Sequence, residues 1–283
     1  MKPRGLLLGL LGLAGGALAA LPAGPGAAAR GPGQPRLVSL NPCTDSIVAE
    51  VADRGQILAL SAYSSDLSQS SMDVGLARSL PATSGTLEEV AVLRPDLVLS
   101  GAMTPPAERA AYARLGLRLE EFASPTSVAA SLAQVRRIAA LAGHPERGEA
   151  LVARISAAVA RASVPPGTRR VETLVWQSGG MVPGGNTLVS ELMDRAGFDN
   201  FSARAGLAQA QILPLEPVLA HPPAAILIAG NLAAGENRLL AHPALAGLKQ
   251  TRRFTFDPVL EWCGGPTIIR AANRLAQIRR EMP

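Results

Sequence analysis

Short apolar runs alternate along the chain with longer stretches in which apolar residues recur every three or four positions. The short runs, which are typical of buried strands, occupy residues 37–40, 57–60, 97–99, 116–122, 171–176, 225–229 and 254–256. The longer stretches have the spacing of amphipathic helices and occupy residues 128–141, 151–159, 188–196 and the segment that ends at 280. Strands that alternate with helices are typical of βαβ units. The pattern therefore predicts an α/β protein with mostly parallel sheets.

One part of this pattern occurs twice. A Leu-Glu pair, a valine and a proline recur at a constant offset of 128 residues, as Leu87, Glu88, Val90 and Pro95 and then as Leu215, Glu216, Val218 and Pro223. Each copy continues into an apolar run that ends in glycine. A helix that stops before a proline and leads into a buried strand is half of a βαβ unit. The repeat therefore predicts two similar lobes, each built on a mostly parallel sheet.

The helical middle of the chain divides the two lobes. Gly143-His144-Pro145 interrupts the first helical stretch, and a Pro-Gly-rich segment at residues 163–167 ends the second. We therefore expect an N-terminal lobe at residues 36–142, a linking helix at 143–166 and a C-terminal lobe at 167–283. A helix between two lobes would permit only a small rocking movement.

Four loops of the N-terminal lobe follow its predicted strands, at residues 41–45, 61–66, 101–104 and 123–126. Loops at the carboxyl ends of parallel strands face one shared crevice. We therefore expect these loops to converge on one edge of the sheet and to line a site there.

The beginning of the chain has the features of a secretion signal. Lys2 and Arg4 precede an apolar run of about 16 residues, too short to span a bilayer, and Ala17-Leu18-Ala19 has the pattern of a cleavage site. We expect a cleavable signal peptide at residues 1–19 and a flexible lead, rich in Gly, Ala and Pro, at residues 20–35. The mature protein would then be a soluble, periplasmic monomer.

The formal net charge of +5 comes from scattered arginines. They form isolated pairs without interleaved aromatic residues, so they lack the basic stripe expected of a nucleic-acid surface. We expect no nucleic-acid partner.

Taken together, these features resemble the substrate-binding proteins of ABC importers, in the group that binds cobalamin, iron siderophores and haem. The resemblance covers about residues 36–280. It rests on Arg36-Leu37-Val38-Ser39-Leu40-Asn41-Pro42, on Leu87-Glu88 before Leu93-Arg94-Pro95-Asp96-Leu97-Val98, and on Leu215-Glu216 before Pro223. It implies two Rossmann-like lobes joined by one long helix, and transport rather than enzyme activity.

In that family two glutamates, one at the tip of each lobe, pair with arginines of the membrane permease. The resemblance gives this role to Glu88 and Glu216. Equivalent carboxylates on two lobes suit a dimeric permease with one basic pocket in each subunit. The alternative is that each glutamate only occupies the first turn of a helix, where the macrodipole favours a negative charge.

The resemblance also suggests the ligand. Tyr63 matches a tyrosine that lines the crevice in cobalamin-binding members, and Trp262 matches an aromatic residue of the facing lobe. Flat aromatic faces suit a flat macrocycle, which favours a corrinoid. The loops at 101–104, 179–186 and 203–211 lack further aromatic residues, however. An iron siderophore or haem therefore stays an alternative, as does ordinary packing of the two side chains.

The two cysteines, Cys43 and Cys263, fall on loops expected to face the same crevice. Three alternatives stay open: a disulfide that joins the lobes, two free thiols that contact the bound chelate, or two small buried residues with no shared role. A thiol-dependent enzyme is a less favoured alternative, because no histidine lies near either cysteine in the sequence.

The three histidines, His144, His221 and His242, lie far apart and each precedes a proline. This arrangement is unlike the histidine-rich sites of proteins that capture bare zinc or manganese. We expect no metal site, no resident cofactor and no catalytic residue.

Overall fold

The computed structural model describes residues 34–230 and 242–282. The expected signal peptide and nearly all of the flexible lead lie outside these residues. Within them, no helix has the length and apolarity that a membrane span requires.

The N-terminal lobe is built on a parallel sheet of five strands in the order β3-β2-β1-β4-β5. The strands are β1 (Leu37–Ser39), β2 (Ile57–Ser61), β3 (Ala82–Thr83), β4 (Leu97–Gly101) and β5 (Leu119–Phe122). The helices are α1 (Pro42–Val51), α2 (Val74–Arg78), α3 (Leu87–Leu93) and α4 (Pro106–Arg114), with single 3₁₀ turns η1 (Arg54–Gln56) and η2 (Ala62–Ser65). The Asn41 side chain caps α1 by accepting a hydrogen bond from the Cys43 amide, and Pro42 occupies its first turn.

The C-terminal lobe repeats this plan with a parallel sheet in the order β11-β10-β6-β8. Its strands are β6 (Val171–Gln177), β8 (Phe198–Asn200), β10 (Ala225–Ala229) and β11 (Arg252–Thr255), and a short antiparallel pair is formed by β7 (Met181–Val182) and β9 (Gln211–Ile212). The helical segments are α7 (Leu188–Arg195), α8 (Phe201–Arg204), α9 (Leu215–Ala220), α10 (Pro243–Ala246), α11 (Val259–Trp262) and α12 (Thr267–Glu281), with the turn η3 (Ser178–Gly180). The expected α/β architecture of two lobes with parallel sheets is confirmed.

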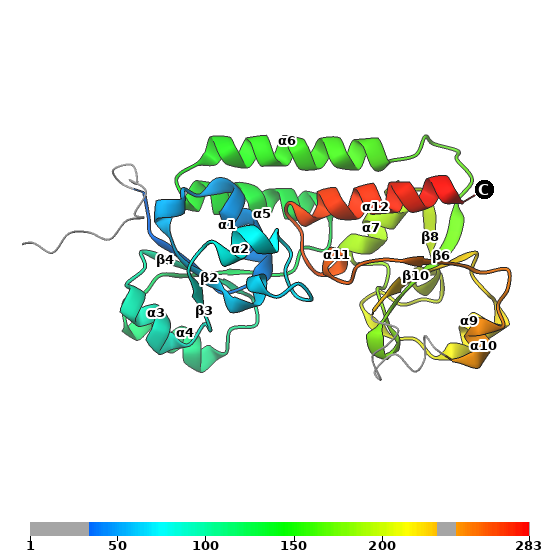
Figure 1. The fold of residues 1–283 in the computed structure, drawn as a ribbon, viewed down its shortest axis with the longest axis horizontal. Coiled ribbons are helices and arrows are strands. Elements are labelled where there is room, and N and C mark those ends of the chain that lie inside the picture. The colour runs from blue at the N-terminus through cyan, green and yellow to red at the C-terminus, as the bar shows by residue number, and fades with distance from the viewer. Residues whose placement is uncertain (1–33, 231–241, 283) are drawn as a thin grey trace, which may run out of the picture.

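A layer of long helices covers one side of both lobes (Figure 1). It contains α5 (Val128–Leu141), α6 (Pro145–Ala162) and α12, and α6 packs against both of the others. The helical spacing predicted for α6 is confirmed, since Leu151, Ile155 and Val159 are all buried. Helix α6 therefore follows the strands of the first sheet and precedes those of the second in the sequence. In space it extends along both lobes (Figure 1).

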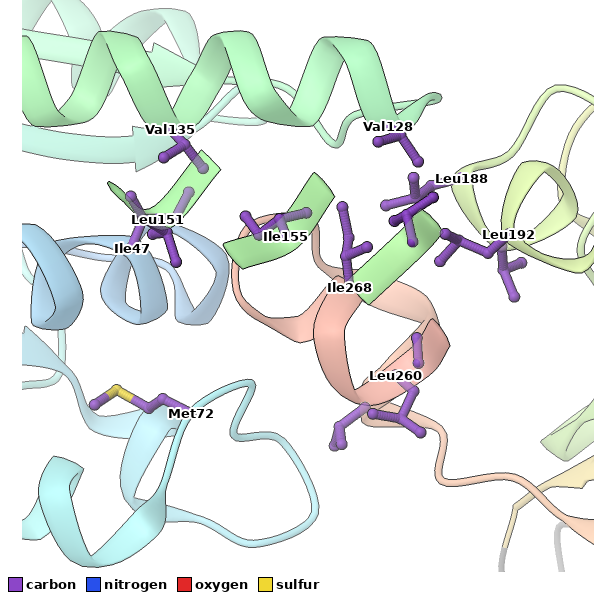
Figure 2. Close-up of a cluster of buried hydrophobic side chains, with 14 of the residues drawn as sticks. Ile47, Met72, Val128, Val135, Leu151, Ile155, Leu188, Leu192, Leu260 and Ile268 are labelled. Carbon is purple, nitrogen blue, oxygen red and sulfur yellow. The ribbon is translucent and has the colours of Figure 1, made fainter. Parts of the chain in front are cut away.

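The two lobes share one hydrophobic core. A single cluster of buried side chains runs from Leu37 in β1 to Ile278 in α12. Figure 2 shows side chains of this cluster from both lobes, including Ile47 of α1 and Ile268 of α12, on either side of Ile155 in α6. Because protein interiors are close-packed and resist deformation, this shared core limits movement of one lobe against the other.

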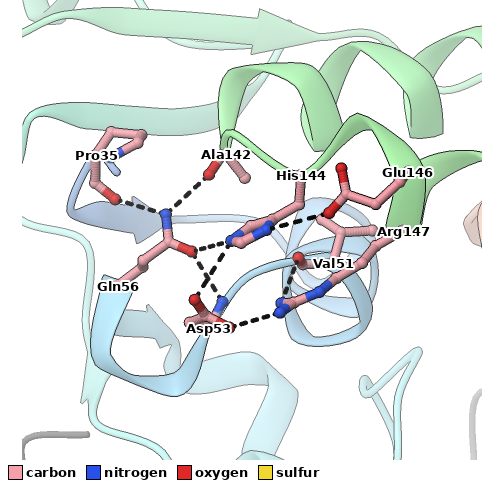
Figure 3. Close-up of polar contacts among 8 residues, drawn as sticks. All are labelled: Pro35, Val51, Asp53, Gln56, Ala142, His144, Glu146 and Arg147. Atoms are coloured by element: carbon pink, nitrogen blue, oxygen red, sulfur yellow. Dashed lines mark hydrogen bonds and ion pairs between the residues drawn. The ribbon is translucent and has the colours of Figure 1, made fainter. Parts of the chain in front are cut away.

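A buried polar network fixes the turn between α5 and α6 (Figure 3). Gln56 donates from Nε2 to the carbonyl oxygens of Pro35 and Ala142, and its Oε1 accepts from the Asp53 amide and from His144 Nε2, at 2.9 Å and 2.8 Å. Because the amide oxygen of Gln56 can only accept a hydrogen bond, His144 Nε2 is the protonated nitrogen in this contact. Both polar atoms of the Gln56 side chain are thus satisfied, which is the condition for burying them at little cost. His144 has a structural role here.

Candidate functional site

Two neighbouring cavities lie beside the loops that follow the strands, one lined by both lobes and one lined by the N-terminal lobe alone. The larger, of about 510 Å³, is here called the inter-lobe cavity, because residues 124–126 line it from the N-terminal lobe and Gln177, Asn186, Glu261 and Trp262 from the C-terminal lobe. The smaller, of about 270 Å³, is lined by Cys43, Met103 and Phe122 among others. Ser124 lines both cavities. The volume of the larger one lies within the range usual for small-molecule sites.

Three of the four loops expected to converge do so. Residues of the loops at 41–45, 101–104 and 123–126 line the smaller cavity together. The loop at 61–66 contributes no lining residue to either of these two cavities. It is instead attached to the start of α1, because Asp45 Oδ2 accepts hydrogen bonds from the Ser61 amide and the Ser64 hydroxyl, at 3.0 Å and 2.6 Å.

Asp45 is completely buried, and its Oδ1 has no hydrogen-bond partner. Burial raises the pKa of this carboxyl to about 8, against the opposing effect of its hydrogen bonds from serine side chains and the Ser61 amide. Burial therefore favours the protonated form of this group near neutral pH. Asp45 positions η2, which carries Tyr63, relative to α1.

The two aromatic residues expected at the site lie in different environments. Trp262, at the end of α11, is 45% exposed and lines the inter-lobe cavity. Tyr63 is 56% exposed in η2 and lines neither of the two cavities. The ligand-contacting roles predicted for both residues stay predictions, and the geometry supports that of Trp262 more directly.

Cys43 and Cys263 form a disulfide with a Cα–Cα distance of 5.0 Å. Of the three alternatives left open by the sequence, the disulfide between the lobes is therefore the one found. The alternative of two free thiols as soft ligands of a bound metal is wrong, because neither sulfur can become a thiolate while the bond exists. The thiol-dependent enzyme loses its nucleophile for the same reason. Cys43 still lines the smaller cavity, whereas Cys263 is buried.

The segment that follows the disulfide is inserted into the N-terminal lobe. The Gly265 amide donates to Ser131 Oγ in α5 at 2.7 Å, and the Thr267 hydroxyl donates to the Ser71 carbonyl oxygen at 3.2 Å. Gly264 is packed so closely that an added Cβ would lie 2.7 Å from Pro125 Cγ. Residues 263–267 thus connect the lobes, next to the helical layer, by a covalent bond, hydrogen bonds and close packing.

Sequence reasoning missed the most unusual polar group of the inter-lobe cavity. Glu261 Oε2 accepts a hydrogen bond from Gln177 Nε2 at 2.6 Å, while its Oε1 is shielded from solvent and has no partner. Burial raises the pKa of this carboxyl to about 8, and the hydrogen bond from Gln177 only partly opposes the shift. The available signal was position, since Glu261 precedes Trp262 and Gln177 directly follows the strand predicted at residues 171–176.

Glu88 and Glu216 occupy equivalent places at the outer ends of the two lobes. Each is exposed in the first turn of its helix, α3 or α9, while Val90 and Val218 point into the protein. In Figure 1 both helices lie on the side of the molecule away from α6. Within the described residues, neither carboxylate forms an ion pair. The neighbouring Glu89 differs, because it accepts hydrogen bonds from Thr83 and Ser84.

The described residues contain no group of three or more His, Cys, Asp or Glu side chains that could hold a metal ion. His144 belongs to the buried network around Gln56. His242 caps α10 by accepting from the Ala244 amide.

Comparison with known proteins identifies the family of this chain and similar solved structures. The model of the family described as periplasmic binding protein matches residues 37–258. No curated protein sequence matches the chain. Similar solved structures include the periplasmic heme-binding protein RhuT from Roseiflexus sp. RS-1, with 23% identity, a TM-score of 0.70 and coverage of 88% of this chain and 99% of that one.

Two further structures come from Vibrio cholerae. The periplasmic heme-binding protein HutB has 16% identity and a TM-score of 0.71, and the alignment covers 86% of this chain and 98% of that one. The periplasmic vitamin B12 binding protein BtuF has 17% identity, a TM-score of 0.66 and coverage of 87% and 96%. At these identities the likeness shows the fold, and the family match covers most of the chain. The family expected from the sequence is confirmed, and the chain belongs to the periplasmic binding protein family.

Proposed function

We propose that the protein captures a metal chelate of the corrinoid class in the cleft between its lobes and delivers it to an ABC importer. Proteins of this family bind small ligands for transport and work in the periplasm. The observation that carries the proposal is the inter-lobe cavity, which is built from both lobes and presents the exposed Trp262 side chain. An aromatic face offers a macrocycle a large contact area at low entropic cost. The similar fold of the vitamin B12 binding protein BtuF supports this ligand class.

Iron chelates are the second candidate. The similar structures of the heme-binding proteins RhuT and HutB favour haem in particular. An iron siderophore would occupy the same cavity.

The ligand can be identified by titrating the protein with cobinamide, cobalamin, hemin and a ferric hydroxamate while tryptophan fluorescence is recorded. The chain has two tryptophans, of which Trp176 is fully buried and Trp262 lines the inter-lobe cavity. We expect a corrinoid to quench Trp262 fluorescence. Trp262→Ala should weaken binding by about 1–3 kcal/mol, the scale of a lost aromatic contact.

Trp176→Phe is the matched control, since it removes the other tryptophan and should retain both affinity and quenching. If neither corrinoid binds while hemin or the ferric hydroxamate does, the second candidate replaces the first. If Trp262→Ala binds a corrinoid as tightly as the wild type, the aromatic contact is wrong.

Delivery requires docking to a permease, and we assign this role to Glu88 and Glu216. Their exposure, their equivalent positions and their freedom from ion pairs with described residues support the assignment. An exposed carboxylate without an intramolecular partner can pair with a basic group of another protein, where it contributes mainly to encounter and orientation.

Glu88→Ala combined with Glu216→Ala should abolish uptake and leave ligand affinity unchanged, because exposed charges contribute little to the fold. The control is Glu146→Ala with Glu281→Ala, which removes two exposed carboxylates from α6 and α12 on the other side of the molecule. Uptake at the wild-type rate by the first double variant would refute the docking role.

A further inference from the structure

Among the described residues that line the inter-lobe cavity, Glu261 has a buried side-chain oxygen without a hydrogen-bond partner. Glu261 Oε1 is shielded from solvent without a partner, whereas Oε2 is occupied by Gln177. Leaving a buried polar atom unpaired is unfavourable. Both side chains line the inter-lobe cavity, so a rotation of the Glu261 carboxyl would turn Oε1 toward a ligand in that cavity, which could supply the missing partner.

The charge of the surroundings restricts what that partner can be. Among the described residues, neither the inter-lobe cavity nor the smaller cavity has a Lys, Arg or His in its lining. Arg137, which stacks on the Phe122 ring, forms an ion pair with Glu120. An anionic group that entered the cleft would lose hydration without gaining a cation from these residues, and such transfers are strongly unfavourable.

We infer that Glu261 and Gln177 select the ligand by charge: they accept a neutral chelate that presents a carboxamide to Glu261, and they disfavour a chelate that presents a carboxylate there. This inference rests on the proposed function and specifies its ligand. A carboxamide offers both an N–H donor and a carbonyl acceptor, so it can satisfy Glu261 Oε1 whether the carboxyl is ionised or protonated. A carboxylate offers only acceptors, and its charge has no counterion in this lining.

The inference distinguishes the candidate ligands. Corrinoids such as cobinamide carry carboxamide side chains around the ring, whereas haem carries two propionate carboxylates. Cobyrinic acid has the corrin ring with carboxylates in place of the amides. Cobinamide and cobyrinic acid therefore form a probe pair with the same ring, so the comparison separates the effect of charge from that of ring stacking on Trp262.

The test measures the affinity of the wild-type protein for dicyanocobinamide, dicyanocobyrinic acid and hemin by calorimetry at pH 7. We expect cobinamide to bind about 100-fold more tightly than cobyrinic acid, since a site built for hydrogen bonding strongly rejects a mismatched group. Hemin should also bind more weakly than cobinamide. Equal affinities for the two corrinoids, or tighter binding of hemin, would overturn the inference.

A variant assigns the selection to the named side chain. Glu261→Gln keeps the shape but presents a permanent amide N–H, so it should reduce the preference for cobinamide over cobyrinic acid by about tenfold or more. The control is Glu172→Gln, which also removes one acidic group from the C-terminal lobe but lies in β6, where its carboxylate pairs with Arg204 at 2.8 Å. The control should keep the wild-type preference.

The outcomes separate this inference from the proposed function. If cobinamide binds but Glu261→Gln, folded as judged by its thermal transition, shows the wild-type preference, the selection by Glu261 is wrong and the corrinoid proposal stands. If neither corrinoid binds the wild-type protein, the corrinoid proposal fails and the charge selection fails with it.

Discussion

Removing the disulfide should destabilise the protein considerably. The bond joins residues 220 apart in the sequence, so it restricts the unfolded chain strongly. The loop-closure relation gives about 5 kcal/mol at 25 °C for a loop of this size, and disulfides measured in proteins typically contribute about 2–4 kcal/mol. For Cys43→Ser with Cys263→Ser we therefore expect a loss of about 2–5 kcal/mol.

The assay is urea unfolding of the oxidised wild type, the reduced wild type and the double serine variant. With a denaturant dependence of about 3 kcal/mol/M, the expected loss lowers the unfolding midpoint by about 1 M. The reduced wild type should unfold near the midpoint of the variant, because both lack the same covalent bond. Thiol titration of the native oxidised protein should detect no free thiol.

Two results would refute this reasoning. Two titratable thiols in the native oxidised protein would show that the bond is absent in solution. An unchanged midpoint in the double variant would show that the bond contributes nothing measurable to the free energy of unfolding, and that the shared core holds the lobes together without it.

Other substitutions test a buried carboxyl group and the packing between the lobes. The pKa of Asp45 is about 8 in the folded protein, against an ordinary value of 3.8. Folding therefore takes up a proton between these pH values, and the stability of the wild type should fall as pH rises from about 4 to 8. Asp45→Asn should remove this pH dependence, so its free energy of unfolding should rise relative to that of the wild type over the same range. An equal pH dependence in both proteins would contradict the raised pKa. Gly264→Ala should destabilise the protein by about 1–3 kcal/mol, because its Cβ would be overpacked against Pro125. Gly167→Ala has open space for its Cβ but a φ of +81°, so its cost of about 1–2 kcal/mol should come from backbone strain alone. The thermal transition measures both, and no loss of stability in Gly264→Ala would show that the lobe junction is not tightly packed.

Features with a local sequence signal could be predicted. The stripe formed by Leu151, Ile155 and Val159 indicated the buried face of α6, because helical periodicity follows directly from backbone geometry. The repeated valines, Val90 and Val218, indicated equivalent buried positions in the two lobes, and both are buried. By contrast, β3, β7 and β9 have two residues each, too few to show any periodicity.

Features that depend on distance through space could not be predicted. The sequence placed Cys43 and Cys263 on loops near one crevice, but it contains no information on their separation, so three alternatives had to stay open. The pKa of Glu261 depends on how much protein surrounds the carboxyl, which is a property of the tertiary fold. The sequence also could not predict that the two lobes share one core, because an apolar stripe on a helix does not reveal which lobe packs against it.

The position of the disulfide determines which movements the lobes can make. It lies next to the helical layer, where the Gly265 amide binds Ser131 of α5 and Thr267 begins α12, so the lobes cannot separate at this point without breaking a covalent bond. Any relative rotation must therefore widen the rim of the cleft, away from the helical layer, more than the part beside that layer. Helices α3 and α9, which carry Glu88 and Glu216, lie on the side of the lobes away from the helical layer (Figure 1), and such a rotation would move them further than residues near the disulfide. A permease that held both carboxylates would thus act on a long lever arm, and a small deformation of the shared core would be enough to change the width of the rim.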